Sequence, residues 1–155
     1  MKAVIGLGSN IGDKENNIRL ALEAFALVPK TSVLRVSSMY GTSPVGYKDQ
    51  DSFVNAVAEI ESSLSPVALL GVCLGIEALM GRRRTIKNGP RIIDIDLLIT
   101  EGFECNTEEL CVPHPRMPER AFVLVPLAEL YPEGVAIGYR FDMSRTDPAD
   151  SVERL

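Results

Sequence analysis

The sequence predicts an α+β fold in which an antiparallel sheet is covered on one face by two helices. Four segments have the apolar pattern of strands and two have the spacing of amphipathic helices, in the order β-α-β-β-α-β. A chain of 155 residues is a typical length for one domain. We therefore expect residues 1–155 to form a single domain, with residues 133–155 as a polar, peripheral tail.

Six segments form the basis of this prediction. We expect strands over residues 2–8, 32–38, 53–61 and most of 88–99, and helices over about residues 14–28 and 66–80. Asp13 and Ser65 are suitable N-caps for the two helices, because their side chains can accept a hydrogen bond from the first turn. Pro29 and Gly81 follow the two helices and predict where each one ends.

Two connecting segments have distinctive compositions. The segment GLGSNIG spaces its glycines unlike a dinucleotide fingerprint or a P-loop, so we expect Gly8 and Gly12 to serve a tight strand-to-helix turn. Residues 40–51 form a loop with two glycines and one proline, and a loop of that length usually has a function. We expect one further short element of secondary structure over residues 122–130.

The third predicted strand alternates strictly between two faces. These are Val54, Ala56, Ala58 and Ile60 on one face, and Phe53, Asn55, Val57, Glu59 and Glu61 on the other. The second face therefore offers an aromatic ring and an amide side by side. That pair is compatible with simple packing, and it also suits a planar heterocycle rich in N–H and C=O groups.

Charge and composition restrict the class of protein. The net charge is −5, yet residues 82–91 contain five basic residues and no acid. One concentrated basic loop suits a compact anion better than an extended nucleic acid, although an ordinary solvated turn has the same composition. We expect neither a nucleic-acid nor a membrane partner, since no run approaches the roughly 18 apolar residues of a membrane span. Three cysteines without ligand spacing and a start unlike a signal peptide predict reduced thiols and a cytoplasmic location.

The last predicted strand contains two carboxylates, Asp94 and Asp96. Period two places them on one face with Ile92 and Leu98, and places Arg91, Ile93, Ile95, Leu97 and Ile99 on the other. Same-face carboxylates about 7 Å apart suit hard cations such as Mg²⁺, which combines oxygen ligands with substrate phosphates. A solvated edge strand would explain the pattern equally well. The preceding basic loop favours the metal site, because phosphoryl transfer needs acids for metal and arginines for phosphate.

The only histidine, His114, lies between two prolines. A single histidine is more often structural than catalytic. Here the prolines fix the backbone and Arg116 follows, which fits a contact with phosphate.

Several segments resemble one enzyme family. The chain is similar to the 6-hydroxymethyl-7,8-dihydropterin pyrophosphokinases of folate biosynthesis in GLGSNIGD, SSMYGTSPVG, FVNAV, IEALMGRRR, GPRIIDIDLLI and VPHPRMPERAFVLVPLAEL. The resemblance covers residues 4 to about 132. It implies a ferredoxin-like fold and a Mg²⁺-dependent transfer of the β,γ-diphosphate of ATP to the pterin's hydroxymethyl oxygen, leaving AMP. We expect two Mg²⁺ ions, a monomer, and other folate-pathway enzymes as its neighbours.

The resemblance also implies a role for individual residues. Asp94 and Asp96 would hold the two Mg²⁺ ions, and Arg82 and Arg91 would act with them in catalysis. The residues that would bind ATP are Glu77, Arg84, Lys87, Leu97, Cys111, Val112, His114, Arg116 and Arg120. Those that would bind the pterin are Thr42, Pro44, Val45, Gly46, Phe53, Asn55 and Phe122, with the two phenylalanines on either side of its ring.

Some positions depart from the family pattern. Leu74 stands where a Gln often helps to hold the nucleotide, and Asn88 stands where a Trp is frequent. Lys87 replaces an Arg and offers a point charge without a bidentate fork. These departures and the abbreviated C-terminal part concern nucleotide affinity and loop closure, and none of them changes the two carboxylates.

Three alternative functions fit parts of the pattern. A ferredoxin-like RNA-binding module would need aromatic side chains and a basic sheet face, whereas FVNAVAEIE is acidic and the chain is only 6% aromatic. A small-molecule-sensing regulatory domain would explain the fold but not the acidic pair beside five basic residues. A nucleotidyltransferase would use the same acidic pair and release pyrophosphate instead of AMP.

Overall fold

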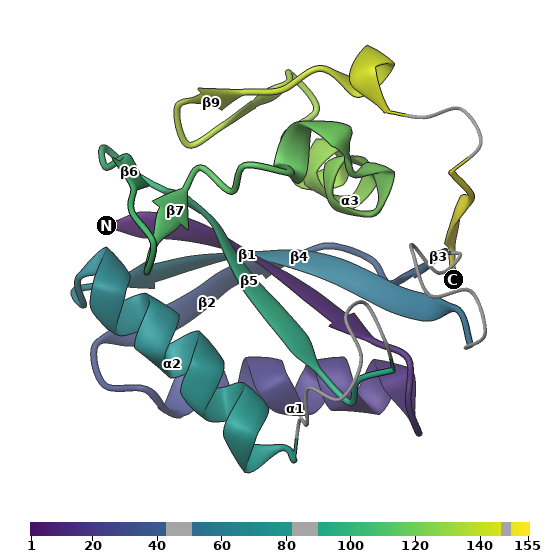
Figure 1. Ribbon diagram of the computed structural model, residues 1–155, viewed down its shortest axis with the longest axis horizontal. Coiled ribbons are helices and arrows are strands. Elements are labelled where there is room, and N and C mark those ends of the chain that lie inside the picture. The colour runs from purple at the N-terminus through teal and green to yellow at the C-terminus, as the bar shows by residue number, and fades with distance from the viewer. Residues whose placement is uncertain (43–50, 82–89, 147–149) are drawn as a thin grey trace.

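The computed structural model of the protein describes residues 1–42, 51–81, 90–146 and 150–155. A central sheet has two helices on one face and a third helix on the other (Figure 1). Within these described ranges, none of the helices is both long enough and apolar enough to cross a membrane.

The secondary structure consists of one large sheet, three helices and several short elements. The large sheet contains β1 (Lys2–Ser9), β2 (Thr31–Val36), β3 (Tyr40–Thr42), β4 (Phe53–Ser62), β5 (Asp94–Thr100) and β10 (Val152–Arg154). The helices are α1 (Lys14–Leu27), α2 (Pro66–Leu79) and α3 (Ala121–Leu130), with the short 3-10 turns η1 (Met117–Glu119) and η2 (Met143–Arg145). Two small hairpins join β6 (Cys105–Asn106) to β7 (Cys111–Val112), and β8 (Val135–Ala136) to β9 (Tyr139–Arg140).

The order of the strands confirms the predicted ferredoxin-like fold. The sheet runs β10-β3-β4-β1-β5, and β2 pairs with β4 further along the edge that β3 also occupies. All of these pairs are antiparallel. The four strands β5-β1-β4-β2, together with α1 and α2, form the predicted β-α-β-β-α-β unit. The short strands β3 and β10 are additions that the sequence pattern did not predict.

Capping groups define the helices as predicted. The Asp13 side chain accepts a hydrogen bond from the backbone N–H of Asn16 at 3.2 Å, and Ser65 accepts one from that of Ala68 at 3.2 Å. Each of the two helices ends one residue before its predicted end. Gly81 has a φ of +83°, the left-handed conformation in which a glycine ends a helix without steric cost.

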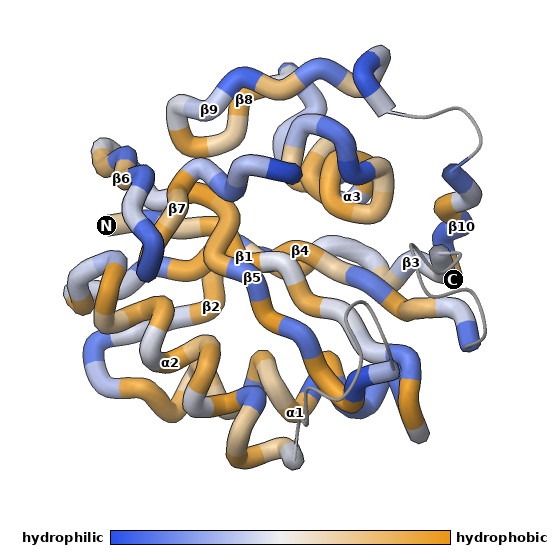
Figure 2. Tube along the Cα trace, in the orientation of Figure 1, coloured by the Kyte–Doolittle hydropathy of each residue, from blue (hydrophilic) through white to orange (hydrophobic). Residues whose placement is uncertain are grey.

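Two hydrophobic cores lie on opposite faces of the sheet. The first packs α1 and α2 against the sheet, around side chains such as Phe25, Ile5 and Leu69. The second packs α3 against the other face, where Leu124 and Leu127 of the helix are fully buried. Figure 2 shows hydrophobic residues along both α3 and the strands that it faces. The sequence pattern predicted only the first of these layers, so α3 makes the fold three layers deep.

A β-bulge changes the predicted alternation near the end of β5. Ile5 pairs with Leu97 while its neighbour Val4 pairs with Ile99, so Leu98 is an extra residue in β5. Leu98 and Ile99 both belong to the core beneath α3. The prediction that Ile99 shares a face with Ile95 and Leu97 was therefore wrong, because the bulge reverses the alternation after Leu97.

The tail beyond residue 132 is attached to the sheet at its edge. Ala136 is fully buried in the second core. Strand β10 pairs with β3, and the backbone N–H of Leu155 donates to the carbonyl of Met39 at 2.9 Å. Residues 133–155 are thus polar in composition, yet they include an edge strand, β10, and a buried core residue, Ala136.

Candidate active site

The two predicted metal ligands lie on one face of β5. Asp94 and Asp96 alternate with Ile95 and Leu97, which are buried in the core beneath α1 and α2. The carboxylates therefore point to the face that α3 covers. Their side chains are 24% and 30% exposed, so they are accessible without being fully solvated. The predicted same-face arrangement is confirmed.

One arginine lies beside each carboxylate. Arg91 Nη1 donates to Asp94 Oδ2 at 2.9 Å, which makes a charge-assisted hydrogen bond. Arg120 Nη1 lies 3.6 Å from Asp96 Oδ2, which is an ion pair too long for a good hydrogen bond. The two arginines come from different segments, since Arg91 precedes β5 and Arg120 immediately precedes α3.

The surroundings of Asp96 disfavour its charged form. Burial raises the pKa of Asp96 to about 6, and the nearby charge of Asp94 raises it further than Arg120 lowers it. Burial and a neighbouring carboxylate both disfavour the charged form of a carboxyl group. A cation bound beside Asp96 would favour its charged form.

Asn10 connects the end of β1 to Arg91 and Asp51, and the sequence analysis missed it. Its Oδ1 accepts from the backbone N–H of Arg91 at 2.8 Å, and its own N–H donates to the Arg91 carbonyl at 3.1 Å. Its Nδ2 donates to the carbonyl of Asp51 at 3.2 Å. Asn10 is only 3% exposed. An asparagine directly after a buried strand was the available signal, because a buried amide needs partners.

An aromatic and amide surface begins next to Arg91. Its guanidinium carbon lies 5.8 Å from the centre of the Phe53 ring, within the range of a cation–π contact. Asn55 is two residues further along β4 and is buried, and its Nδ2 donates to Thr42 Oγ1 at 2.7 Å. The predicted pterin-binding residues Thr42, Phe53 and Asn55 are thus brought together.

Gly8 has a different purpose from the predicted turn. It lies within β1 opposite Asn55, and a Cβ atom there would stand 2.7 Å from Asn55 Oδ1. The absence of a side chain at Gly8 therefore makes room for the amide. Only Gly12, with a φ of +71°, adopts the left-handed conformation expected of a turn glycine.

Phe122 approaches the site from α3. It is the second residue of the helix and is partly exposed. The guanidinium carbon of Arg120 lies 5.4 Å from the centre of its ring. Arg120 therefore links Phe122 to Asp96, so the aromatic ring and the acidic pair lie within the reach of one side chain.

A cavity of about 270 Å³ adjoins the carboxylates on the α2 side. Its lining includes the predicted nucleotide-binding residues Glu77, Leu97, Cys111 and His114, as well as both carboxylates and Leu74. Glu77 is buried, and its Oε1 accepts from the backbone N–H of Ile95 at 2.9 Å. Val112 and Arg116 directly follow the lining residues Cys111 and Pro115 but do not line the cavity themselves. Val112 is buried in the core, and Arg116 is exposed.

His114 is held as a neutral ring. Burial lowers its pKa to about 4, and the positive charge of Arg120 lowers it as well. Its Nδ1 accepts from the backbone N–H of Arg116 at 3.2 Å. The proton of the neutral ring is therefore on Nε2, where it can be donated to an anionic ligand.

Six predicted site residues fall outside the described residues. They are Pro44, Val45, Gly46, Arg82, Arg84 and Lys87. Within the described ranges, no group of three or more His, Cys, Asp or Glu side chains is placed to hold a metal ion. Any metal at Asp94 and Asp96 would thus take further ligands from substrate or water.

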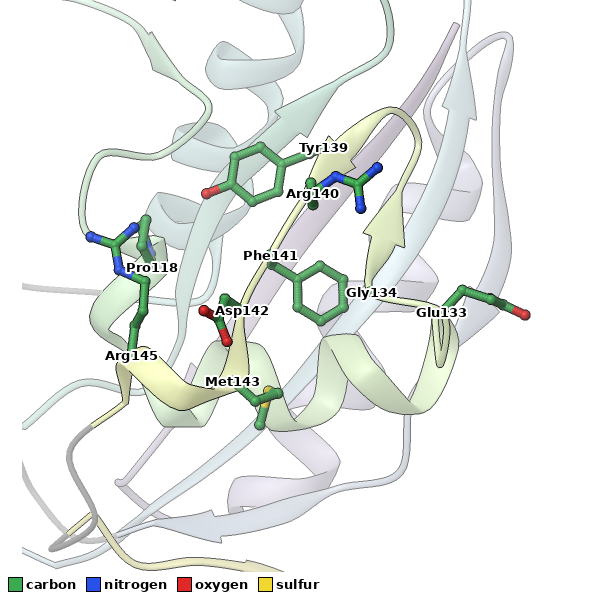
Figure 3. A pocket seen from close by; sticks show the side chains of 9 residues that line it. All are labelled: Pro118, Glu133, Gly134, Tyr139, Arg140, Phe141, Asp142, Met143 and Arg145. Atoms are coloured by element: carbon green, nitrogen blue, oxygen red, sulfur yellow. The ribbon is translucent and has the colours of Figure 1, made fainter.

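A second cavity, of about 510 Å³, lies beside η2 and the hairpin of β8 and β9 (Figure 3). Its lining includes Tyr139, Phe141 and charges of both signs, among them Asp142 and Arg145. Asp142 accepts hydrogen bonds from the backbone and hydroxyl of Ser144, so it serves as a local cap. None of the predicted site residues lines this cavity.

An acidic pair flanked by arginines on an α+β sheet is typical of enzymes that transfer phosphate groups. The sequence matches the 7,8-dihydro-6-hydroxymethylpterin-pyrophosphokinase (HPPK) family over residues 4–132. The chain belongs to this family.

Named relatives agree with this assignment. The 2-amino-4-hydroxy-6-hydroxymethyldihydropteridine pyrophosphokinase of Methylorubrum extorquens is 47% identical over 99% of this chain and 98% of its own length. The protein of the same name from Bacillus subtilis is 48% identical over 83% of this chain and 77% of its own.

A solved structure shares the fold. A Plasmodium falciparum HPPK-DHPS crystal structure matches 92% of this chain with a TM-score of 0.63 and 16% sequence identity. This chain spans only 42% of that longer protein. At this low identity the likeness shows the fold alone.

Proposed function

We propose that the protein transfers the β,γ-diphosphate of ATP to the hydroxymethyl oxygen of 6-hydroxymethyl-7,8-dihydropterin, a step of folate biosynthesis. The supporting observation is the placement of Asp94 and Asp96 on one face of β5, each beside an arginine. The aromatic and amide surface at Phe53 and Asn55 lies next to one of these arginines. The names of the relatives support the same reaction.

The bonds of this reaction balance without a further reactant. The hydroxymethyl oxygen forms a bond to the β-phosphorus, and the bond from that phosphorus to the oxygen it shares with the α-phosphorus breaks. That oxygen leaves with AMP, and the hydroxyl proton is released. Arg91 lies between Asp94 and the Phe53 ring, so its charge is placed where the phosphate and the alcohol would meet.

Asp94 and Asp96 fit a Mg²⁺ site for two ions. They offer oxygen ligands on one accessible face, and a bound cation would favour the charged form of Asp96, whose pKa burial and Asp94 raise. When bound, the ions would supply positive charge to the oxygens of the triphosphate. The chain's own contribution is to orient the carboxylates through Arg91 and Arg120.

ATP would occupy the cavity beside α2. Glu77, Cys111 and the backbone near Leu97 would border the nucleoside, and His114 would donate from Nε2 to a phosphate oxygen. Arg84, Lys87, Arg116 and Arg120 would add positive charge around the triphosphate, and Arg82 would stabilise charge during transfer.

The pterin would lie between Phe53 and Phe122. Asn55 would bond the polar edge of the ring, because its amide offers both a donor and an acceptor. Thr42 orients that amide through its hydroxyl group. Backbone groups of Thr42 to Gly46 would complete the pocket.

We further propose that the protein acts as a monomer in the cytoplasm, close to other enzymes of the folate pathway. All three cysteines are free, and Cys73 is buried. Free thiols are typical of a reducing compartment.

The test is to incubate the protein with ATP, Mg²⁺ and 6-hydroxymethyl-7,8-dihydropterin and to separate the products by chromatography. We expect equal amounts of AMP and pterin diphosphate, and no AMP when pterin is omitted. Release of ADP would refute the proposal, and release of pyrophosphate would identify a nucleotidyltransferase instead.

A further inference from the structure

Helix α3 carries Phe122 near one end and Glu129 near the other. The two residues are seven positions apart, which is nearly two turns, so they lie on the same face of the helix about 10 Å apart along its axis. Any rotation of α3 about its axis would therefore move both side chains together.

Glu129 makes directional hydrogen bonds to the segment that contains β3. Its two carboxylate oxygens accept from the backbone N–H of Ser38 at 3.1 and 2.9 Å. Its Oε1 also accepts from the hydroxyl of Tyr40 at 2.5 Å. Tyr40 is only 6% exposed, so this hydroxyl has little access to water.

The partner strand continues directly to the proposed pterin site. Tyr40 and Thr42 are two residues apart in β3 and share a face. Tyr40 pairs with Asn55 and Thr42 pairs with Phe53 in the register of β3 and β4. Glu129 thus ties the face of α3 that carries Phe122 to the strand that borders Phe53 and Asn55.

The other described contacts of α3 are apolar packing or bonds at its two ends, where Arg120 just before the helix pairs with Asp96. Leu124 and Leu127 hold the helix on the sheet by apolar packing, which is not directional. At the end of the helix, Arg35 Nη1 donates to the Leu130 carbonyl at 2.8 Å, and the Tyr131 hydroxyl donates to Glu59. These bonds fix where the helix ends, whereas Glu129 fixes the direction in which its Phe122 face points.

We propose that Glu129 is a positioning residue for the pterin site, and that its bonds to Ser38 and Tyr40 set the rotation of α3 and thereby the placement of Phe122 opposite Phe53. The inference rests on the proposed function, because it requires that Phe122 stacks on the pterin. Glu129 itself touches no substrate.

The test measures pterin affinity by calorimetry in the presence of Mg²⁺ and an ATP analogue with a methylene group between the α- and β-phosphates. Glu129→Ala should weaken pterin binding about tenfold, the effect of losing a charge-assisted hydrogen bond. The KM for ATP in the normal assay should change by less than about twofold, because α3 does not line the nucleotide cavity. Glu129→Gln keeps an acceptor and should restore most of the affinity.

Two further variants separate positioning from general stability. Ser65→Ala removes the N-cap of α2, which costs about as much stability as Glu129→Ala. It should leave pterin affinity unchanged. In a Phe122→Ala background, Glu129→Ala should weaken pterin binding by less than about twofold more, since Glu129 acts through Phe122. Additive effects of the two substitutions would overturn the inference.

The outcome distinguishes this inference from the proposed function. A wild-type protein that makes no AMP and binds no pterin would refute the proposed function. A wild-type protein that turns over pterin, together with a Glu129→Ala variant of unchanged pterin affinity, would refute only the positioning role. Crystal structures of the wild type and of Glu129→Ala, both without ligand, provide a readout independent of substrate. An identical placement of Phe122 in the two structures would also refute the positioning role.

Discussion

Replacing Gly8 with alanine tests the geometry of the pterin site with a single methyl group. The new Cβ would lie 2.7 Å from Asn55 Oδ1, closer than real Cβ atoms approach another atom, so one of them must move. The β1 backbone is held by pairing with β4 on one side and β5 on the other. Asn55 is therefore the group that moves.

The structure gives the size of the effect. Displacing Asn55 breaks its hydrogen bond to Thr42 Oγ1, and leaving a buried polar group unpaired costs about 1–3 kcal/mol. The same displacement moves the amide away from the edge of the pterin. We expect the Kd for pterin to rise about tenfold or more, since about 1.4 kcal/mol corresponds to a factor of ten.

The assay is a calorimetric titration of pterin, with thermal unfolding measured in parallel. Gly71→Ala is the matched control, because a Cβ there meets nothing within 4 Å. Gly71 lies inside α2, so this control should keep its pterin affinity and gain up to about 1 kcal/mol of stability. An unchanged pterin affinity in Gly8→Ala would refute the assignment of Asn55 to the pterin edge.

Three further predictions concern stability and the nucleotide. Phe25→Ala should lower the free energy of unfolding by about 3–5 kcal/mol, because this side chain is fully buried in the first core, and chemical denaturation would measure the loss. Burial would raise the pKa of Glu59, but hydrogen bonds from Arg35 and Tyr131 outweigh burial and lower this pKa. The contribution of Glu59 to stability is therefore complete at pH values above the ordinary carboxyl pKa. It is lost as the pH falls through the lower pKa of the folded state. Glu59→Gln should thus flatten the acid side of a plot of stability against pH. His114→Ala should raise the KM for ATP about tenfold in steady-state kinetics, while leaving pterin affinity within about twofold.

Periodicity and capping were sufficient to predict the ferredoxin-like part of the fold. The alternation of β4 and the N-caps at Asp13 and Ser65 are local signals, so the sequence displays them directly. The position of α3 could not be predicted in this way. Its apolar residues pack against the face of the sheet opposite α1 and α2, and nothing local in residues 122–130 states which face that is.

The sequence pattern also could not predict some contacts of the site residues. The same-face placement of Asp94 and Asp96 follows from period two, but the pairing of Asp96 with Arg120 joins segments on different elements. The role of Gly8 depends on the register between β1 and β4, which no local pattern reveals. Asn10 bonds to backbone groups of Arg91 and Asp51, which lie near each other only in the folded chain.

The central claim is that Asp94 and Asp96 support Mg²⁺-dependent transfer to the pterin. The most direct measurement is AMP formation from ATP, Mg²⁺ and 6-hydroxymethyl-7,8-dihydropterin by Asp94→Asn and Asp96→Asn, with circular dichroism to confirm that each variant is folded. The account predicts that both variants fold and that both lose nearly all AMP formation. AMP formation close to that of the wild type in both variants would contradict it.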